Sequence, residues 1–261
     1  MGDVNLNFKP AVPVFDANMA LGRRHDRRVS VDTVDETLKE MNRSGVDRAL
    51  VYAPHAVTYD SAEGNSLLLE TIHGDSRLVP QFVCNPAFDD FDAFTSWVKE
   101  AKIRSVRMVP GAHNYPFRDW VVKRWLDWFA AEKIPVWLPT EYGIITETVH
   151  LNPSEAHDTV KAHPNLNVVL SEVHYGHVGW ALPLIRSLPN ISIEISRFVI
   201  ADPIARLMKA VGEERILFGS RFPSQYIAPH IYTLHHSGLS DETLKKICSG
   251  NLERLLGMRQ P

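Results

Sequence analysis

The chain has 261 residues, of which 44% are apolar and 23% charged, and its formal net charge is -3. This composition is typical of a globular protein, and the weak charge gives no electrostatic reason to expect nucleic acid or an anionic membrane as partner. The two cysteines, Cys84 and Cys248, lie far apart in sequence, which excludes a zinc ribbon and favours a reducing compartment. No stretch approaches the roughly 18 apolar residues of a transmembrane helix. The first residues also lack a signal-peptide core, so we expect a cytoplasmic protein.

Short apolar runs recur along the chain and predict strands. Several are rich in valine and isoleucine and do not alternate with polar residues, as is typical of strands buried on both faces. The predicted strands are Val12–Phe15, Arg48–Tyr52, Leu78–Val83, Ile103–Val109, Ile134–Leu138, Leu166–Leu170, Ile191–Ile195 and Ile216–Phe218.

The segments between these runs carry helix signals. We expect one helix to begin at Asp32 and to stop at Gly45, and another to begin at Asp89. Pro153 suits the first turn of a later helix, and the hydroxyl of Ser240 suits the cap of the last one.

The alternation of strands and helices predicts the fold class. About eight strand–helix repeats in a chain of this length are the rhythm of a (β/α)₈ TIM barrel, an α/β fold. The alternative is a doubly wound open sheet, which usually carries a glycine-rich turn after its first strand. Residues Asp16 to Gly22 lack that glycine spacing. We therefore predict one TIM-barrel domain over residues 1–261.

Six phrases, in order along the chain, resemble the amidohydrolase-related (amidohydrolase-2) family of TIM-barrel metal-dependent hydrolases and decarboxylases. The segment 15–22 resembles the family's first strand, which usually reads Asp-x-His-x-His-x-Gly. The segment 216–223 resembles the eighth strand, usually Phe-Gly-Ser/Thr-Asp-Tyr/Phe-Pro. The others are 46–51, 134–138, 163–170 and 250–257. The resemblance implies an amidohydrolase-like barrel that is a hydrolase or a carbon–carbon lyase.

The chain departs from the family at the positions that the resemblance assigns to the metal. The first-strand histidine pair maps to Asn18 and Ala20, and the eighth-strand aspartate maps to Arg221. Alanine and a protonated guanidinium cannot ligate a metal, and an asparagine amide is a poor zinc ligand. The fifth-strand histidine maps to Pro139 or Thr140, and the sixth-strand histidine to Glu172 or His174. We therefore expect no metal cofactor, with a divalent metal such as zinc disfavoured.

Polar side chains that follow the predicted strands should converge, because the active site of a TIM barrel lies at the C-terminal ends of its strands. These residues are Asp16, Asn18, His55, Asn85, Arg107, His113, Glu141, Tyr142, Glu172, His174, His177, Glu194, Ser196, Arg197, Ser220 and Arg221.

Two arginines are the candidate anion-binding groups. Arg221 can hold a substrate carboxylate or phosphate, or it can form a structural salt bridge to Glu172 or Asp16. Arg107 has the same alternatives, an anion contact or a strand-end ion pair. The other predicted substrate contacts are Asn18, His113, Glu141 and Ser220.

His174 is the leading candidate for general acid or base, because imidazole titrates near neutral pH and needs only a carboxylate to orient it. Glu172 is the expected orienting group, or itself the base. His55 is the alternative proton carrier, and Asp16 completes the predicted catalytic set.

Three hypotheses follow from these residues. The first is a metal-independent hydrolase or lyase that acts on a small anionic substrate through Arg221 and Arg107. The second is an enzyme with a remodelled divalent-metal site built on Glu172 and His174, with His55 or His113. The third is a non-catalytic barrel that binds a small ligand or partner. In the enzyme hypotheses the partner is a small molecule, and a homo-oligomer stays open.

Overall fold

A computed structural model of the protein describes residues 8–24, 28–142 and 149–258. Its parallel strands are β1 (Phe15–Ala20), β2 (Arg48–Tyr52), β3 (Leu78–Pro80), β4 (Phe82–Cys84), β5 (Val106–Met108), β6 (Val136–Pro139), β9 (Val168–Ser171), β10 (Ile191–Glu194) and β11 (Ile216–Leu217). They form a sheet of order β1-β2-β3 and a sheet of order β11-β10-β9-β6-β5-β4. A separate antiparallel pair joins β7 (Glu141–Tyr142) to β8 (Val149–His150).

The two parallel sheets are joined at both edges, by backbone hydrogen bonds at one edge and by the chain running through Gln81 at the other. On one side, Ala17 N donates to Phe218 O over 2.9 Å, and Met19 forms a bridge with Phe222. On the other side, Gln81 lies between β3 and β4 and donates its amide to Val51 O over 2.8 Å. The strands therefore follow one another around a TIM barrel, as the sequence predicts.

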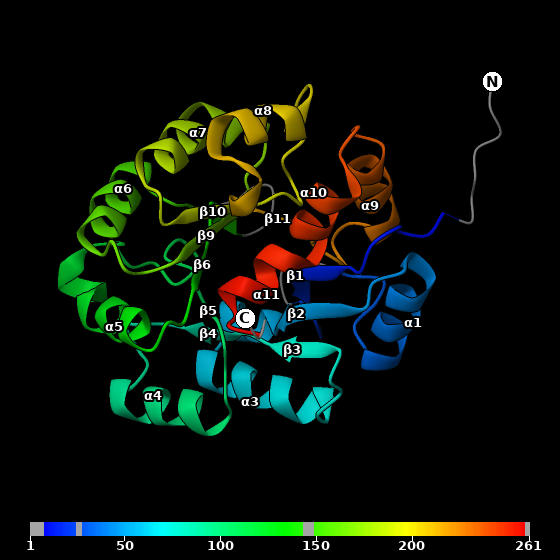
Figure 1. Ribbon diagram of the computed structural model, residues 1–261. Coiled ribbons are helices and arrows are strands. Elements are labelled where there is room, and N and C mark those ends of the chain that lie inside the picture. Colours follow the sequence, from blue (N-terminus) through cyan, green and yellow to red (C-terminus); the bar gives the residue numbers. More distant parts are fainter. Residues whose placement is uncertain (1–7, 25–27, 143–148, 259–261) are drawn as a thin grey trace.

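Helices surround the strands in Figure 1. They are α1 (Val34–Ser44), α2 (Pro54–Thr58), α3 (Ser61–Ile72), α4 (Phe91–Glu100), α5 (Asp119–Ala131), α6 (Pro153–Ala162), α7 (Val178–Ser187), α8 (Pro203–Val211), α9 (Ile227–His235), α10 (Asp241–Lys245) and α11 (Asn251–Leu255). In the described part of the chain, no helix combines the length and apolar character needed to cross a membrane.

The helix boundaries follow the sequence signals closely. Gly45 ends α1 with φ 75°, a conformation that suits glycine, and Ser240 accepts a hydrogen bond from Thr243 N at the start of α10. The N-cap of α1 is Thr33 and that of α4 is Asp90, each one residue beyond the predicted Asp32 and Asp89. In both helices this side chain accepts a hydrogen bond from a backbone N–H group of the first turn that has no partner within the helix.

Two strand predictions need correction. The first strand is Phe15–Ala20 and not Val12–Phe15, because the polar residues Asp16 and Asn18 continue the strand as buried interior groups. The predicted strand Leu78–Val83 is divided at Gln81, whose side chain is also buried. A search for apolar runs misses strands whose inward residues are polar.

The barrel interior has an apolar layer and a polar layer. The apolar layer lies at the end covered by α11, which crosses the ring in Figure 1, and contains Phe15, Leu50, Trp137, Val169 and Leu217 with Leu252 and Leu255. The polar layer contains Asn18, Gln81, Arg107 and Glu194, all 1% exposed or less. This layer leads into the C-terminal ends of the strands, where the candidate site lies. The assignment of residues 1–261 to one domain stays a prediction.

Candidate active site at the barrel mouth

Asn18 on β1 joins the polar groups at the barrel mouth. Its Nδ2 donates to Glu172 Oε1 and to Glu194 Oε2, each over 3.0 Å, and its Oδ1 accepts from Arg107 Nη2 over 2.9 Å. These partners fix the orientation of the amide, since only its nitrogen can donate to two carboxyl groups. We call Asn18, Arg107, Glu172, Glu194 and Arg221 the mouth cluster.

Arg107 forms the buried floor of the mouth cluster. Its Nε donates to Gln81 Oε1 over 2.9 Å, and its guanidinium lies 4.0 Å from the centre of the Tyr52 ring. The residue is 1% exposed, and within the described residues its Nη1 has no hydrogen-bond partner. A buried cationic N–H group without an acceptor is costly, and an anionic ligand would satisfy it.

Arg221 and Glu172 form an ion pair at the ends of two strands. Arg221 Nε contacts Glu172 Oε2, and both residues have φ 61°, in the left-handed region that residues other than glycine rarely adopt. Burial would raise the pKa of Glu172, but Arg221, Asn18 and two further arginines lower it below the ordinary value. Of the two alternatives for Arg221, the structure contains the salt bridge to Glu172. That contact uses Nε, and the guanidinium carries two further amino groups.

The carboxyl groups of Glu194 and Asp16 have raised pKa values, in contrast to the lowered pKa of Glu172. Both are fully buried. Burial and the nearby charge of Glu172 raise the pKa of Glu194 to about 8, against opposing hydrogen bonds from Ser196. Burial likewise raises the pKa of Asp16 to about 6. At neutral pH, Glu194 therefore stays protonated below the mouth.

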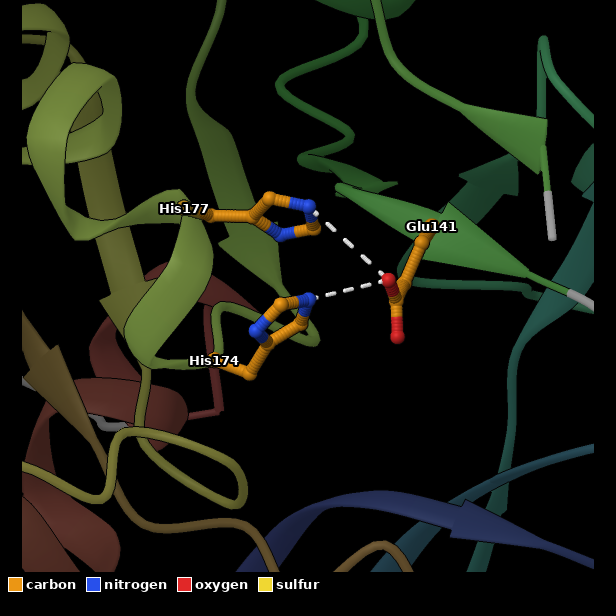
Figure 2. A group of neighbouring side chains, drawn as sticks. All are labelled: Glu141, His174 and His177. Atoms are coloured by element: carbon orange, nitrogen blue, oxygen red, sulfur yellow. Dashed lines mark hydrogen bonds and ion pairs between the residues drawn. The ribbon is translucent and has the colours of Figure 1, made fainter. Parts of the chain in front are cut away.

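A second group of polar side chains lies beside the mouth cluster, and Figure 2 shows Glu141, His174 and His177. We call these three the histidine–glutamate cluster. Glu141 follows β6, and both histidines follow β9. His174 Nε2 lies 3.1 Å and His177 Nε2 3.8 Å from Glu141 Oε2. The other oxygen, Glu141 Oε1, contacts Arg197 Nη1.

Backbone and hydroxyl partners fix the proton positions on both rings. Gly176 N donates to His174 Nδ1 over 3.0 Å, so the neutral His174 ring carries its proton on Nε2. Thr140 Oγ1 donates to the Glu172 carbonyl over 2.8 Å and lies 2.9 Å from His177 Nδ1. His177 therefore donates from Nδ1, and its Nε2 lone pair faces Glu141.

His174 is oriented by Glu141 and not by Glu172 as the sequence reasoning expected. The left-handed backbone of Glu172 directs its carboxylate to Asn18 and Arg221, whereas His174, two residues later, faces the end of β6. Through Nε2, His174 can act as an acid toward a substrate or as a metal ligand. It cannot do both at once.

Other predicted site residues have structural contacts elsewhere. His55 lies 3.4 Å from Glu63 and packs on Tyr59, and the His113 ring packs against the backbone of α2, where burial lowers its pKa. Ser220 is fully buried, and its amide donates to Asp16 Oδ1 over 3.1 Å. Asp16 and Ser220 thus brace the strands below the mouth.

Three groups were expected at the barrel mouth but were given no catalytic or binding role: His177, Glu194 and Arg197. Each follows or ends a strand, which placed it at the mouth without indicating its partners. Arg197 contacts Glu141 and lies 3.9 Å from Glu172, so it connects the mouth cluster with the histidine–glutamate cluster.

A family comparison agrees with the observed barrel. A protein-family model described as Amidohydrolase matches residues 14–258, nearly the whole chain. The chain belongs to the amidohydrolase-2 family. The expected membership and fold class are thereby confirmed. No curated protein sequence matches the chain.

Solved structures of decarboxylases have the same fold as this family member. The 5-carboxyvanillate decarboxylase of Sphingomonas paucimobilis is 14% identical with a TM-score of 0.75, and covers 95% of this chain and 100% of its own. A 2,6-dihydroxybenzoate decarboxylase from Rhizobium is 14% identical with a TM-score of 0.76, and covers 95% of this chain and 99% of its own. A dihydroxybenzoic acid decarboxylase from Polaromonas is 13% identical with a TM-score of 0.77, and covers 96% and 98%.

The expectation of no metal cofactor is corrected by these structures. The Polaromonas decarboxylase was crystallised with bound manganese, and so was a 5-carboxyvanillate decarboxylase from Novosphingobium aromaticivorans. Because these structural neighbours hold a divalent metal, the expectation of no metal cofactor is not supported.

The family's usual metal position nevertheless does not fit a cation in this chain. Asn18 Oδ1 already accepts from Arg107, and Ala20 has no donor atom. Arg221 has no lone pair, and it is paired with the Glu172 carboxylate. A divalent ion at this position would be repelled by two guanidinium groups.

Proposed function

We propose that the chain is a hydrolase or carbon–carbon lyase that acts on a small substrate bearing a carboxylate. Family membership supports the reaction class, and the structural neighbours include decarboxylases of hydroxylated aromatic carboxylates. A fold alone hosts many activities, so the proposal depends on the residues at the mouth.

The arginines around Glu172 are the observation that carries the proposal. Arg107, Arg197 and Arg221 all surround this carboxylate, although its two oxygens can satisfy only part of their N–H groups. Arg221 and Arg197 have side chains 18% and 21% exposed, so they are accessible from the mouth. Guanidinium groups hold carboxylates through paired hydrogen bonds, and several together favour a bound anion.

Each group in the mouth cluster has a distinct part in this proposal. Arg221 contacts the substrate carboxylate with its free amino groups, while Glu172 holds its Nε. Arg107 supports Asn18 from below and supplies the unpaired Nη1 at the floor. Glu194, protonated at neutral pH, adds no negative charge that would oppose the anion.

Paired ligands test the proposal. A panel of small aromatic and aliphatic carboxylates is titrated by calorimetry against counterparts that lack the carboxylate, for example 2,6-dihydroxybenzoate against resorcinol. Carbon dioxide release and product formation are followed in parallel, with added Zn²⁺ or Mn²⁺. We expect at least one carboxylate to be bound and turned over, and its counterpart to bind weakly.

A matched pair of variants makes the test specific to the site. Arg221→Met should weaken carboxylate binding about 10–100-fold, the loss of one charged hydrogen bond of about 1.5–3 kcal/mol. Arg124→Met is the control, because Arg124 is an exposed arginine whose partner, Asp92, lies on α4. The proposal fails if carboxylates bind no better than their counterparts, or if both variants bind them like the parent protein.

A further inference from the structure

Imidazole groups converge on a single carboxylate oxygen in the histidine–glutamate cluster. Glu141 Oε2 lies 3.1 Å from His174 Nε2 and 3.8 Å from His177 Nε2, as the dashed lines in Figure 2 indicate. One ligand atom from each of the three residues lies within 4.8 Å of the others. A third imidazole, His150 on β8, places Nδ1 3.6 Å from the same oxygen.

These separations match those of atoms that share one metal ion. Zinc binds imidazole nitrogen and carboxylate oxygen at about 2.0–2.2 Å, so two ligands at a tetrahedral angle are about 3.3–3.6 Å apart. The nitrogen-to-oxygen distances of 3.1, 3.6 and 3.8 Å lie in or close to this range. An ion would therefore need only small side-chain movements to reach its ligands.

The orientation of His177 favours a ligand role. Its Nδ1–H group is held by the Thr140 hydroxyl, and its Nε2 lone pair faces a carboxylate oxygen, another acceptor. Two acceptors facing each other are unfavourable unless a cation or a proton lies between them. A metal-binding histidine typically donates a hydrogen bond from its other ring N–H group to a fixed partner. His177 has this arrangement, with Thr140 as the partner.

Glu141 is also held in place for this role. Arg197 contacts Oε1 and leaves Oε2 toward the histidines. The guanidinium reduces the negative charge available to a cation, so the imidazoles must supply much of the affinity. Nitrogen-rich sites of this kind favour Zn²⁺ over Mn²⁺, Mg²⁺ and Ca²⁺, which prefer oxygen ligands.

We propose that Glu141, His174 and His177 bind a divalent transition-metal ion, displaced from the family's usual metal position to the ends of β6 and β9. Arg221 fills the vacated position, and the cation lies beside the arginines. His174 then serves as a ligand, in place of the acid–base role expected from the sequence. This inference goes beyond the proposed function, because metal binding can be measured without a substrate.

The three ligands should not contribute equally. A cation on His174 Nε2 displaces the proton there to Nδ1, where the ring loses the hydrogen bond from Gly176 N. His177 needs no such change, since its proton already lies on Nδ1. Loss of His177 should therefore weaken binding more than loss of His174.

Metal binding to the untagged, chelator-treated full chain tests the proposal. Calorimetry with Zn²⁺, Mn²⁺ or Mg²⁺ and metal analysis after gel filtration should show one equivalent of Zn²⁺ and weaker binding of Mn²⁺ and Mg²⁺. Glu141→Gln and His177→Ala should weaken Zn²⁺ binding more than about a hundredfold, and Thr140→Val about 10–100-fold. His157→Ala is the matched control, because His157 is an exposed histidine paired with Asp158 outside the cluster. It should leave binding unchanged.

Thermal unfolding of each variant separates folding defects from lost ligands. Glu141→Gln keeps the shape of the side chain, so it decides the question even if His177→Ala unfolds. The proposal is wrong if the parent protein binds no stoichiometric Zn²⁺, or if Glu141→Gln and Thr140→Val bind it as well as the parent does. It is also wrong if only Glu172→Gln abolishes binding, since that would return the metal to the family's position. None of these outcomes depends on carboxylate binding at Arg221.

Discussion

Glu194 should make the stability of the protein fall as the pH rises. Its pKa is raised from 4.5 to about 8 in the folded protein, chiefly by burial and by the charge of Glu172. A group with a raised folded-state pKa contributes stability fully below its unfolded pKa and loses it as the pH rises through the folded value. At 1.36 kcal/mol per pKa unit, the loss between pH 5 and pH 8 is about 3–4 kcal/mol.

Glu194→Gln removes this titration and keeps the size of the side chain. Urea unfolding at pH 5, 6.5 and 8 should show the free energy of unfolding of the variant rising relative to the parent by about 3–4 kcal/mol across this range. The amide can also change the free energy of unfolding by an amount that does not depend on pH. That amount cancels, because only the change of the free energy of unfolding with pH is compared. Asp16 and Glu172 also face Glu194, but they are present in both proteins. The exposed Glu100→Gln should show no such trend, and a pH-independent difference for Glu194→Gln would refute the reasoning.

Two further predictions concern the mouth cluster. Arg221→Met leaves the buried Glu172 carboxylate without its main partner and should lower the free energy of unfolding by about 3 kcal/mol in urea titrations. The double variant with Glu172→Gln should recover most of this stability but none of the carboxylate binding. Recovery of both would show that the Arg221–Glu172 ion pair has only a structural role. Gly219→Ala should cost about 1–3 kcal/mol by thermal unfolding, because a Cβ there would lie 2.2 Å from Glu194 Oε1. A variant as stable as the parent would mean that Glu194 can move aside.

The sequence predicted most of the fold because the strands are apolar runs with regular helical segments between them. The strand at Ile191–Glu194, for example, lies within the predicted range Ile191–Ile195. The first strand was misplaced because two of its buried residues, Asp16 and Asn18, are polar. Hydrophobic periodicity cannot identify a strand that faces a polar barrel interior.

The location of the candidate site was also predictable, but the pairing of its residues was not. The C-terminal ends of the strands brought Arg221, Glu172 and His174 to the mouth, as expected. However, the partner of His174 depends on the left-handed backbone at Glu172, which directs that carboxylate toward Asn18. Sequence patterns do not encode such a local reversal, because residues other than glycine rarely adopt it.

The correction on metal binding has a related cause. The departures at Asn18, Ala20 and Arg221 show that the usual position cannot hold a cation. They say nothing about a site formed by side chains from other strand ends. Glu141 and His177 are 36 positions apart in the sequence, and only the parallel pairing of β6 with β9 brings them together.

The central claim is that a guanidinium occupies the family's metal position while the cation lies at a neighbouring cluster. Diffraction at the zinc absorption edge, from crystals grown with Zn²⁺ and a carboxylate that binds, tests it most directly. The claim predicts an anomalous peak within bonding distance of Glu141 Oε2 and His177 Nε2, with the carboxylate on Arg221. An anomalous peak between Asn18 and Glu172, with Arg221 moved aside, would contradict it.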